Sequence, residues 1–192
     1  MNDNFAAAYS VAIVGNSGVG KTSILQRLYK QTFSNNNLPT IGIEYKAHLV
    51  PIEGETVKFV IWDTSGQDRF RNIVINYFKI VHGVIIVFDL TDRKSFIDIN
   101  RWLEYIRLLN SSDPVIFLVG NKSDEESHFV EYEINEFAQN HNFRYFELSA
   151  KDNINIEEAF SLFFQEIHRL NKNDSESNSL GNNAQNTTQG NS

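Results

Sequence analysis

The segment GNSGVGKT, residues 15–22, constrains this chain most strongly, because it fits the pattern G-x-x-x-x-G-K-[ST]. A short apolar run, VAIV at 11–14, precedes the segment and indicates a strand. The sequence TSILQRLYK at 22–30 follows it with the apolar spacing of a helix. A glycine-rich turn between a strand and a helix presents backbone N–H groups to an anion, and the helix dipole adds to the attraction. The segment therefore predicts a phosphate-binding loop for a nucleoside triphosphate.

The residue types within this loop indicate separate roles. We expect the phosphates to lie in the turn formed by the backbone N–H groups of Gly18, Val19, Gly20 and Lys21. The Lys21 side chain would contact the outer phosphates, and the Thr22 hydroxyl would bind a magnesium ion. An accidental match in a glycine-rich turn is the alternative.

The segment NKSD, residues 121–124, predicts which base is bound. It follows the apolar run PVIFLVG at 114–120, so it emerges at the same carboxyl edge of the sheet as the phosphate loop. The Asp124 carboxylate can accept two hydrogen bonds from guanine, from N1–H and from the exocyclic amino group, a pair that adenine lacks. A site built in this way can reject the wrong base by roughly 10⁴-fold. These residues favour guanine over the alternative, an ATP-dependent P-loop enzyme.

Strand patterns alternate with helical patterns through most of the chain. Two apolar runs, IEYKAHLVPI and TVKFVIW, flank the turn EGE at 53–55, which predicts a hairpin. The segment 95–109 has apolar residues three and four apart, which predicts a helix. We therefore expect an α/β fold with a mostly parallel sheet, helices on both faces and one antiparallel edge strand. The 192 residues suffice for one such domain without disulfides, and the chain has no cysteine.

The two ends of the chain differ in composition from the middle. We expect residues 1–8 to be frayed, residues 9–171 to form the domain, and the polar residues 172–192 to be disordered. The first ten residues lack the pattern of a signal peptide, and no apolar run approaches the length of a membrane span. The net charge of -7 argues against nucleic acid as a partner. These observations predict a cytoplasmic protein.

Several motifs together make the sequence resemble the Ras superfamily of small GTPases over residues 9–171. They are, in chain order, GNSGVGKT, LPTIG, DTSGQ, NKSD and SAK. Within the superfamily the sequence is most similar to Rab proteins, through IGIEYK, KFVIW, DRFRNI, NYFKIVHG and VFDLTD. The resemblance implies a P-loop small GTPase fold with a doubly wound, six-stranded sheet. It also implies a molecular switch that binds GTP or GDP and acts in vesicle-mediated transport.

The resemblance also implies a set of ligand-binding residues. Magnesium would be bound by Thr22, Thr40 and Asp63, and Thr40 would sense the γ-phosphate. Phe33 would lie against the edge of the guanine, although an aromatic residue at this place is also typical of a core. The full set of nucleotide-binding residues would be Ser17, Gly18, Val19, Gly20, Lys21, Thr22, Ser23, Phe33, Thr40, Gly66, Asn121, Lys122, Asp124, Ser149, Ala150 and Lys151.

For hydrolysis, the resemblance assigns catalytic roles to Gln67, which would orient the attacking water, and to Lys21. Gly66 would offer its N–H to the γ-phosphate. No arginine lies in the segment that resembles switch I, NNNLPTIG at 35–42, so we expect slow hydrolysis that a GTPase-activating protein (GAP) accelerates by about 10⁵. Most relatives carry alanine and glutamate where this chain has Ser65 and Asp68. We expect hydrolysis to survive these changes; a guanine-nucleotide-binding scaffold with impaired hydrolysis is the alternative.

An aromatic effector patch of Tyr45, Trp62 and Tyr77 is a further implication of the resemblance. Strand alternation places Trp62 on the same face as Lys58, which favours the outer face. Tyr45, however, alternates in phase with Leu49, so packing in the core is an equal alternative.

The expected partners are a guanine nucleotide exchange factor (GEF), a GAP and effectors, acting on a monomer. Rab proteins usually end in prenylated cysteines, whereas the tail here has none and a single basic residue, Lys172. We expect the encoded chain to continue past Ser192 to such cysteines. They would make the protein peripheral on endomembranes and a partner of a GDP dissociation inhibitor. An atypical switch without a lipid is the alternative.

Overall fold

The computed structural model describes residues 5–30, 32–33, 40, 43–64, 81–109 and 113–185. Six strands form one sheet in the order β2-β3-β1-β4-β5-β6. Every neighbouring pair is parallel except β2 and β3. The strands are β1 (Ala7–Val14), β2 (Ile43–Ile52), β3 (Glu55–Thr64), β4 (Gly83–Asp89), β5 (Val115–Asn121) and β6 (Arg144–Leu148). The predicted α/β class with one antiparallel edge strand is confirmed.

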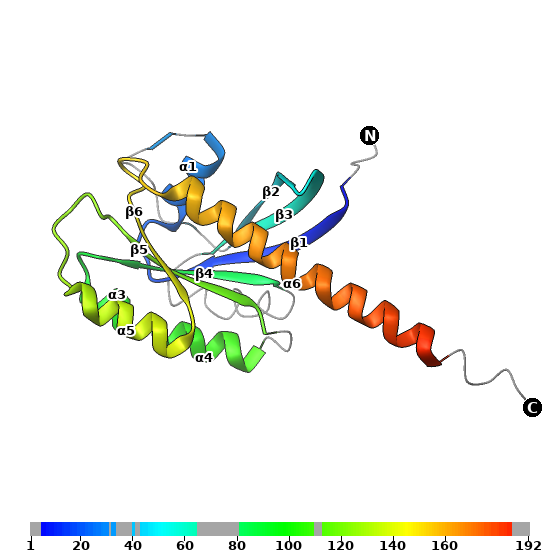
Figure 1. The fold of residues 1–192 in the computed structure, drawn as a ribbon. Helices are drawn as coiled ribbons and strands as arrows, with labels where there is room; N and C mark the ends of the chain where they lie inside the picture. Colours follow the sequence, from blue (N-terminus) through cyan, green and yellow to red (C-terminus); the bar gives the residue numbers. More distant parts are fainter. Residues whose placement is uncertain are drawn as a thin grey trace, which may run out of the picture.

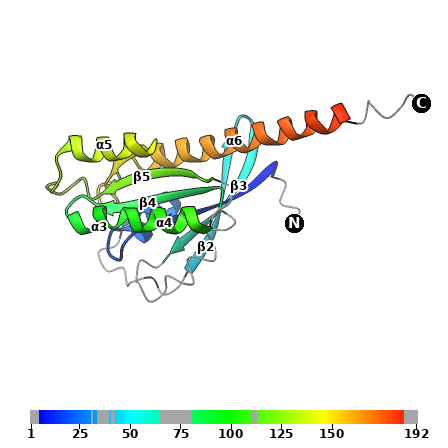
Figure 2. The same cartoon turned by 90° about the horizontal axis from the view of Figure 1, so that it is seen from below.

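Helices cover both faces of this sheet (Figure 1). Those described are α1 (Lys21–Lys30), α3 (Arg93–Ile97), α4 (Ile99–Leu109), α5 (Glu131–His141) and α6 (Ile156–Gln185). One apolar core lies between the sheet and α1 with α6, and a second lies between the sheet and α3, α4 and α5. Figure 2 shows the same fold from below.

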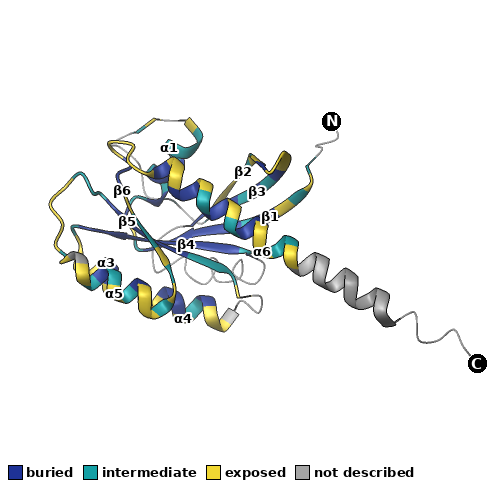
Figure 3. Ribbon diagram, viewed as in Figure 1, coloured by how far each residue is buried: buried dark blue, intermediate teal, exposed yellow. Residues whose placement is uncertain are grey.

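Strand β4 explains why the centre of the molecule is apolar on both sides. All seven of its residues are buried, and Ile85 and Val87 face the core under α1 and α6. The alternating residues Val84, Ile86 and Phe88 face the other core. Figure 3 shows that the central strands are buried along most of their length. A strand covered on both faces gains more from burial than an edge strand, so the sheet is anchored at its middle.

The predicted hairpin joins β2 to β3 through a two-residue turn. Glu53 and Gly54 have φ values of 51° and 81°, the left-handed pair that a type I′ turn requires. Glycine adopts this conformation without steric cost, which explains its place in the turn. The hairpin is therefore confirmed.

The helix predicted over 95–109 is divided into α3 and α4 at Asp98. The Asp98 N–H donates to the Lys94 carbonyl at 3.0 Å and so ends α3. Its own carbonyl accepts from the Arg101 N–H at 3.1 Å and so begins α4. The apolar spacing continues across this junction, because Phe96 and Ile99 are both buried in the same core.

The two ends of the domain differ from the predicted boundaries. Strand β1 begins at Ala7, within the segment predicted to be frayed, because its backbone pairs with β3 from Ala7 opposite Val57. Backbone pairing does not need apolar side chains, so composition did not reveal it. At the other end α6 continues to Gln185, past the predicted start of disorder at 172. Once a packed helix exists, each further residue adds a hydrogen bond without a new nucleation cost.

Candidate nucleotide and magnesium site

The predicted site segments meet at the carboxyl edge of the sheet. The phosphate loop follows β1, and Asp63 near the end of β3 lies opposite Ile13 in the register. Asn121 ends β5, and Ser149 follows β6, whose last residue Leu148 pairs with Asn121. Since parallel strands end at the same edge, segments far apart in sequence form one site, as in other open α/β sheets.

The phosphate loop is shaped by close packing against Asn121. Gly20 has φ +97°, and a Cβ at this position would collide with the Asn121 side-chain amide. That amide donates to the Val19 carbonyl at 2.8 Å, while the Asn121 side-chain oxygen accepts from the Ala150 N–H at 3.1 Å. Asn121 therefore ties the phosphate loop to the loop after β6.

Lys21 lies inside the phosphate loop with its charge held by backbone oxygens. Its ammonium donates to the carbonyls of Gly15 at 2.9 Å and Asn16 at 2.8 Å. The side chain is only 6% exposed, and burial lowers its pKa to about 8, although the Asp63 carboxylate acts in the opposite direction. A buried cation in this position attracts anionic oxygens. Its placement suits the predicted contact with the outer phosphates.

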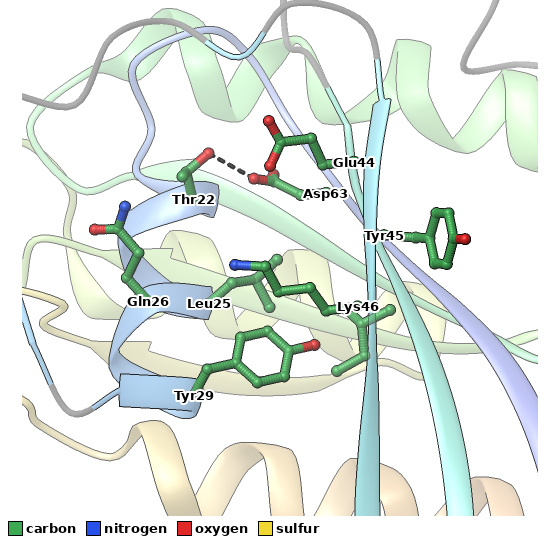
Figure 4. A pocket seen from close by; sticks show the side chains of 9 residues that line it. Thr22, Leu25, Gln26, Tyr29, Glu44, Tyr45, Lys46 and Asp63 are labelled. Carbon is green, nitrogen blue, oxygen red and sulfur yellow. Dashed lines mark hydrogen bonds between the residues drawn. The ribbon is translucent and has the colours of Figure 1, made fainter.

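The three predicted magnesium ligands lie together. The Thr22 hydroxyl donates to Asp63 Oδ2 at 2.7 Å, as Figure 4 shows, and lies 2.9 Å from the Thr40 hydroxyl. The other Asp63 oxygen, Oδ1, is buried and has no hydrogen-bond partner among the described residues. Burial raises the pKa of Asp63, and the Thr22 hydrogen bond and the Lys21 charge lower it only in part.

The oxygen atoms of these three side chains fit a hard divalent cation as ligands. Magnesium prefers oxygen ligands and is usually held by one or two carboxylates together with phosphate oxygens and water. A buried carboxylate oxygen without a partner is costly, and a cation would remove that cost. Among the described residues, no cluster of three histidine, cysteine, aspartate or glutamate side chains offers another site.

On the base side, Asp124 is held from two directions. Its Oδ1 accepts from the Ser149 hydroxyl at 2.6 Å, and its Oδ2 accepts from the Lys151 ammonium at 3.1 Å. Burial tends to raise the Asp124 pKa, but these two bonds outweigh it and hold the pKa below its ordinary value. The carboxylate is thus kept charged, as an acceptor for guanine would need to be.

A cleft joins the phosphate loop to the base side. Phe33 is half-buried and lines this cleft, while its ring also packs against the core under α1 and α6, so the predicted core packing is observed and the contact with guanine stays a prediction. Ser17 is exposed in the loop and does not line the cleft. The cleft is lined by Gly18, Gly20, Ser23, Phe33, Asn121, Lys122, Asp124, Glu125, Ala150 and Lys151.

Two further residues support the base side, and sequence reasoning missed both. The Arg27 guanidinium donates to the carbonyls of Ala150, at 2.6 Å, and Lys151, and it lies 5.6 Å from the centre of the Phe33 ring. Asp89 forms an ion pair with Lys122, whose backbone has φ +69°. In the sequence, an arginine late in a helix is indistinguishable from a solvated one, so no signal marked Arg27.

A small pocket lies between α1 and the β2–β3 hairpin beside Asp63 (Figure 4). The hydroxyl of Tyr29 is buried there without a hydrogen-bond partner among the described residues. Burial, and then the nearby Asp63 charge, raise the Tyr29 pKa. The Lys46 ammonium lies 5.4 Å from the centre of the Tyr29 ring. This pocket extends the polar surroundings of the magnesium ligands.

The predicted effector residues are placed only in part. The Tyr45 side chain is 67% exposed, so the alternative that it packs in the core is wrong. Its ring lies 5.0 Å from that of Trp62, directly opposite on β3, and Trp62 is half-buried against the core under α4. Strand β2 lies at the edge of the sheet, and Leu49, on the same face of the strand as Tyr45, is also 58% exposed. Tyr77 lies outside the described residues.

The residues predicted to assist hydrolysis, in the DTSGQ motif that resembles switch II, also lie outside the described part of the chain. They are Gly66 and Gln67, with the two departures Ser65 and Asp68. Their roles remain predictions.

Comparison with known proteins agrees with this geometry. The model of the Ras family matches residues 10–169, so the chain belongs to the Ras family and is a small GTPase. It is Rab-like, as its curated relatives indicate. GTP-binding protein YPT1 of Saccharomyces cerevisiae is 40% identical over 169 residues, which cover 87% of this chain and 82% of the relative. Ras-related protein Rab-13 of Mesocricetus auratus is 38% identical over 161 residues, which cover 83% of this chain and 79% of the relative.

Within the described residues, no helix combines the length and apolar character that crossing a membrane requires.

Proposed function

We propose that this chain is a magnesium-dependent GTP switch that acts in vesicle-mediated transport. The observation that carries the proposal is the convergence of Lys21, Thr22, Thr40 and Asp63 on one edge, with one Asp63 oxygen left without a described partner. The held Asp124 carboxylate supplies the guanine acceptor on the same edge. The similarity to Rab and Ypt proteins supports the trafficking role.

In this proposal Thr22, Thr40 and Asp63 hold the magnesium ion. When bound, the ion neutralises charge on the phosphate oxygens. Thr40 belongs to the segment between α1 and β2, so its hydroxyl beside Thr22 links that segment to the magnesium site. The γ-phosphate would order this segment, and hydrolysis would release it.

Hydrolysis requires positioning more than covalent chemistry. Lys21 places a buried positive charge next to the phosphates, Gly66 offers its N–H to the γ-phosphate, and Gln67 orients the water. Without an arginine in switch I, the rate is slow until a GAP supplies the missing charge.

Single-turnover GTP hydrolysis tests this assignment. For the wild type we expect a rate on the order of 10⁻⁴ to 10⁻² per second that is lost on removal of magnesium. Gln67→Leu should lower the rate by at least about tenfold, whereas Gln139→Leu, at an exposed position on α5, should not. A wild-type rate below detection, unchanged by Gln67→Leu, would favour the scaffold with impaired hydrolysis.

The proposed partners are a GEF, a GAP and effectors, with a GDP dissociation inhibitor if the native chain ends in prenylated cysteines. In that case the protein is peripheral on endomembranes. Tyr45 and Trp62, together with Tyr77, form the proposed effector patch, which the exposure of Tyr45 supports.

The effector patch is tested by capture of proteins on the GTP-loaded chain. Tyr45→Ala should abolish GTP-dependent capture and change the free energy of unfolding by less than about 0.5 kcal/mol, because the side chain is mostly exposed. Leu49→Ala is a matched control, exposed on the same phase of β2. Equal capture by both variants and the wild type would count against the patch.

A further inference from the structure

The side chain of Asn16 points out of the phosphate loop toward the α3–α4 junction. Its Nδ2 donates to Asp98 Oδ2 at 2.8 Å, and its Oδ1 accepts from Trp102 Nε1 at 3.4 Å. Asp98 lies 82 residues and Trp102 lies 86 residues further along the chain. A loop residue bonded at both ends of its side chain is fixed to another part of the fold.

The partners of Asn16 belong to a firmly held element. Asp98 ends α3 and begins α4 through its backbone, which leaves its carboxylate for the phosphate loop. Trp102 is only 2% exposed and packs in the core under α4. Because a packed indole cannot move without opening a cavity, it gives Asn16 a rigid reference point.

The backbone of the same residue holds the catalytic lysine. The Asn16 carbonyl accepts from the Lys21 ammonium at 2.8 Å, beside the Gly15 carbonyl at 2.9 Å. Lys21 is almost fully buried, so these two oxygens define where its charge lies. Asn16 therefore connects the α3–α4 junction at one end with the lysine at the other.

We propose that Asn16 is a positioning residue: its bonds to Asp98 and Trp102 set the location of the Lys21 ammonium, and thereby the hold on the outer phosphates of GDP and GTP. The inference rests on the proposed contact of Lys21 with these phosphates. The clamp, defined here as Asn16, Asp98 and Trp102, lies outside the residues assigned to ligand binding.

The test exchanges the amide of position 16 and the carboxylate of position 98. Asn16→Asp brings two carboxylates together, so release of a fluorescent GDP analogue should be about tenfold faster than in the wild type. In the double variant Asn16→Asp/Asp98→Asn, the amide introduced at position 98 donates to the carboxylate introduced at position 16, and Trp102 still donates to that carboxylate. Release should then return to within about threefold of the wild-type rate.

A spectroscopic readout separates positioning from general destabilisation. In ³¹P NMR of the bound GDP, the β-phosphate resonance should shift in Asn16→Asp and return in the double variant, because Lys21 contacts the outer phosphates. Asp92→Asn is the matched control, since Asp92 caps the start of α3 without touching the phosphate loop and asparagine caps equally well. It should change neither the release rate nor the resonance.

Each remaining outcome bears on a separate claim. A double variant that releases GDP as fast as Asn16→Asp, or faster release with an unmoved β-phosphate resonance, would overturn the clamp. If Asn16→Asp does not fold, Asp98→Ala carries the test, with release expected to be about fivefold faster and a shifted resonance; wild-type values would overturn the proposal. Lys21→Ala with wild-type release would instead refute the proposed role of Lys21.

Discussion

On the base side of the cleft, both oxygens of Asp124 are hydrogen-bonded within the protein, whereas on the magnesium side one oxygen of Asp63 has no partner among the described residues. The two carboxylates consequently have opposite pKa shifts. Burial acts on both, but Ser149 and Lys151 outweigh it at Asp124, while Thr22 and Lys21 do not outweigh it at Asp63.

This difference indicates which half of the site is complete before ligand binding. The base side is held by hydrogen bonds within the chain, and Asn121 and Arg27 join its loops. On the proposed magnesium side a carboxylate, two hydroxyls and a buried lysine lie together, and one oxygen of the carboxylate has no partner among the described residues. Buried charge without full compensation is a cost to folding that a bound ion and phosphates would remove.

The largest expected effect is on the base side. Asp124→Ala removes the proposed guanine acceptor together with the anchor of Ser149 and Lys151. We expect affinity for GDP, measured by titration with a fluorescent analogue, to fall by roughly 10⁴-fold. Glu125→Ala is the control, because Glu125 lines the same cleft but is exposed. Similar losses in both variants would mean that cleft charge, rather than the Asp124 bonds, governs affinity.

The next largest effect is expected for Asp63→Asn on the magnesium side, where ligand affinity and stability should change in opposite directions. Asp63→Asn should lower affinity for GDP in magnesium by about 10–100-fold, with little further loss on chelation. The same change should stabilise the ligand-free protein by about 1 kcal/mol, or about 2–4 °C in Tm, because it removes a buried charge that is only partly paired.

Calorimetry of the nucleotide-free protein measures the stability term. Asp92→Asn, a neutralisation at the exposed start of α3, should leave both the magnesium dependence and Tm unchanged. A lower Tm for Asp63→Asn would show that the protein compensates this carboxylate after all, and the contrast with Asp124 would disappear.

The smallest expected effect concerns Arg27, which links α1 to the loop after β6. Arg27→Lys keeps the charge, but an ammonium does not reproduce the planar pair of donors that reaches the Ala150 and Lys151 carbonyls. Release of GDP should be about threefold faster, with unchanged dependence on magnesium. Lys30→Arg, at the exposed end of the same helix, should have no effect. A change in magnesium dependence would place Arg27 in the other half of the site.

Prediction from sequence succeeded where a local pattern determines the structure. The phosphate loop lies between β1 and α1, and the EGE turn forms the hairpin, because glycine conformations and apolar spacing act over a few residues. For Tyr45 it determined the phase along β2 but left an exposed and a core position as equal alternatives, and only the structure shows that the side chain is exposed. Whether a strand face is covered depends on which other elements pack on it, and the sequence of the strand alone does not determine that.

The sequence by itself determined which side chains the proposed site contains: a lysine in a glycine-rich turn, predicted to bind phosphates, hydroxyls and a carboxylate, predicted to bind magnesium, and Asp124, predicted to bind guanine. Tertiary structure decided how these groups are supported. Arg27 beneath the base loops, Asp89 beside Lys122, and the Asn16 clamp all join residues distant in the chain. The physical reason is that hydrogen bonds and charge pairs depend on distance in space, and only the packing of the sheet and helices brings these residues within reach.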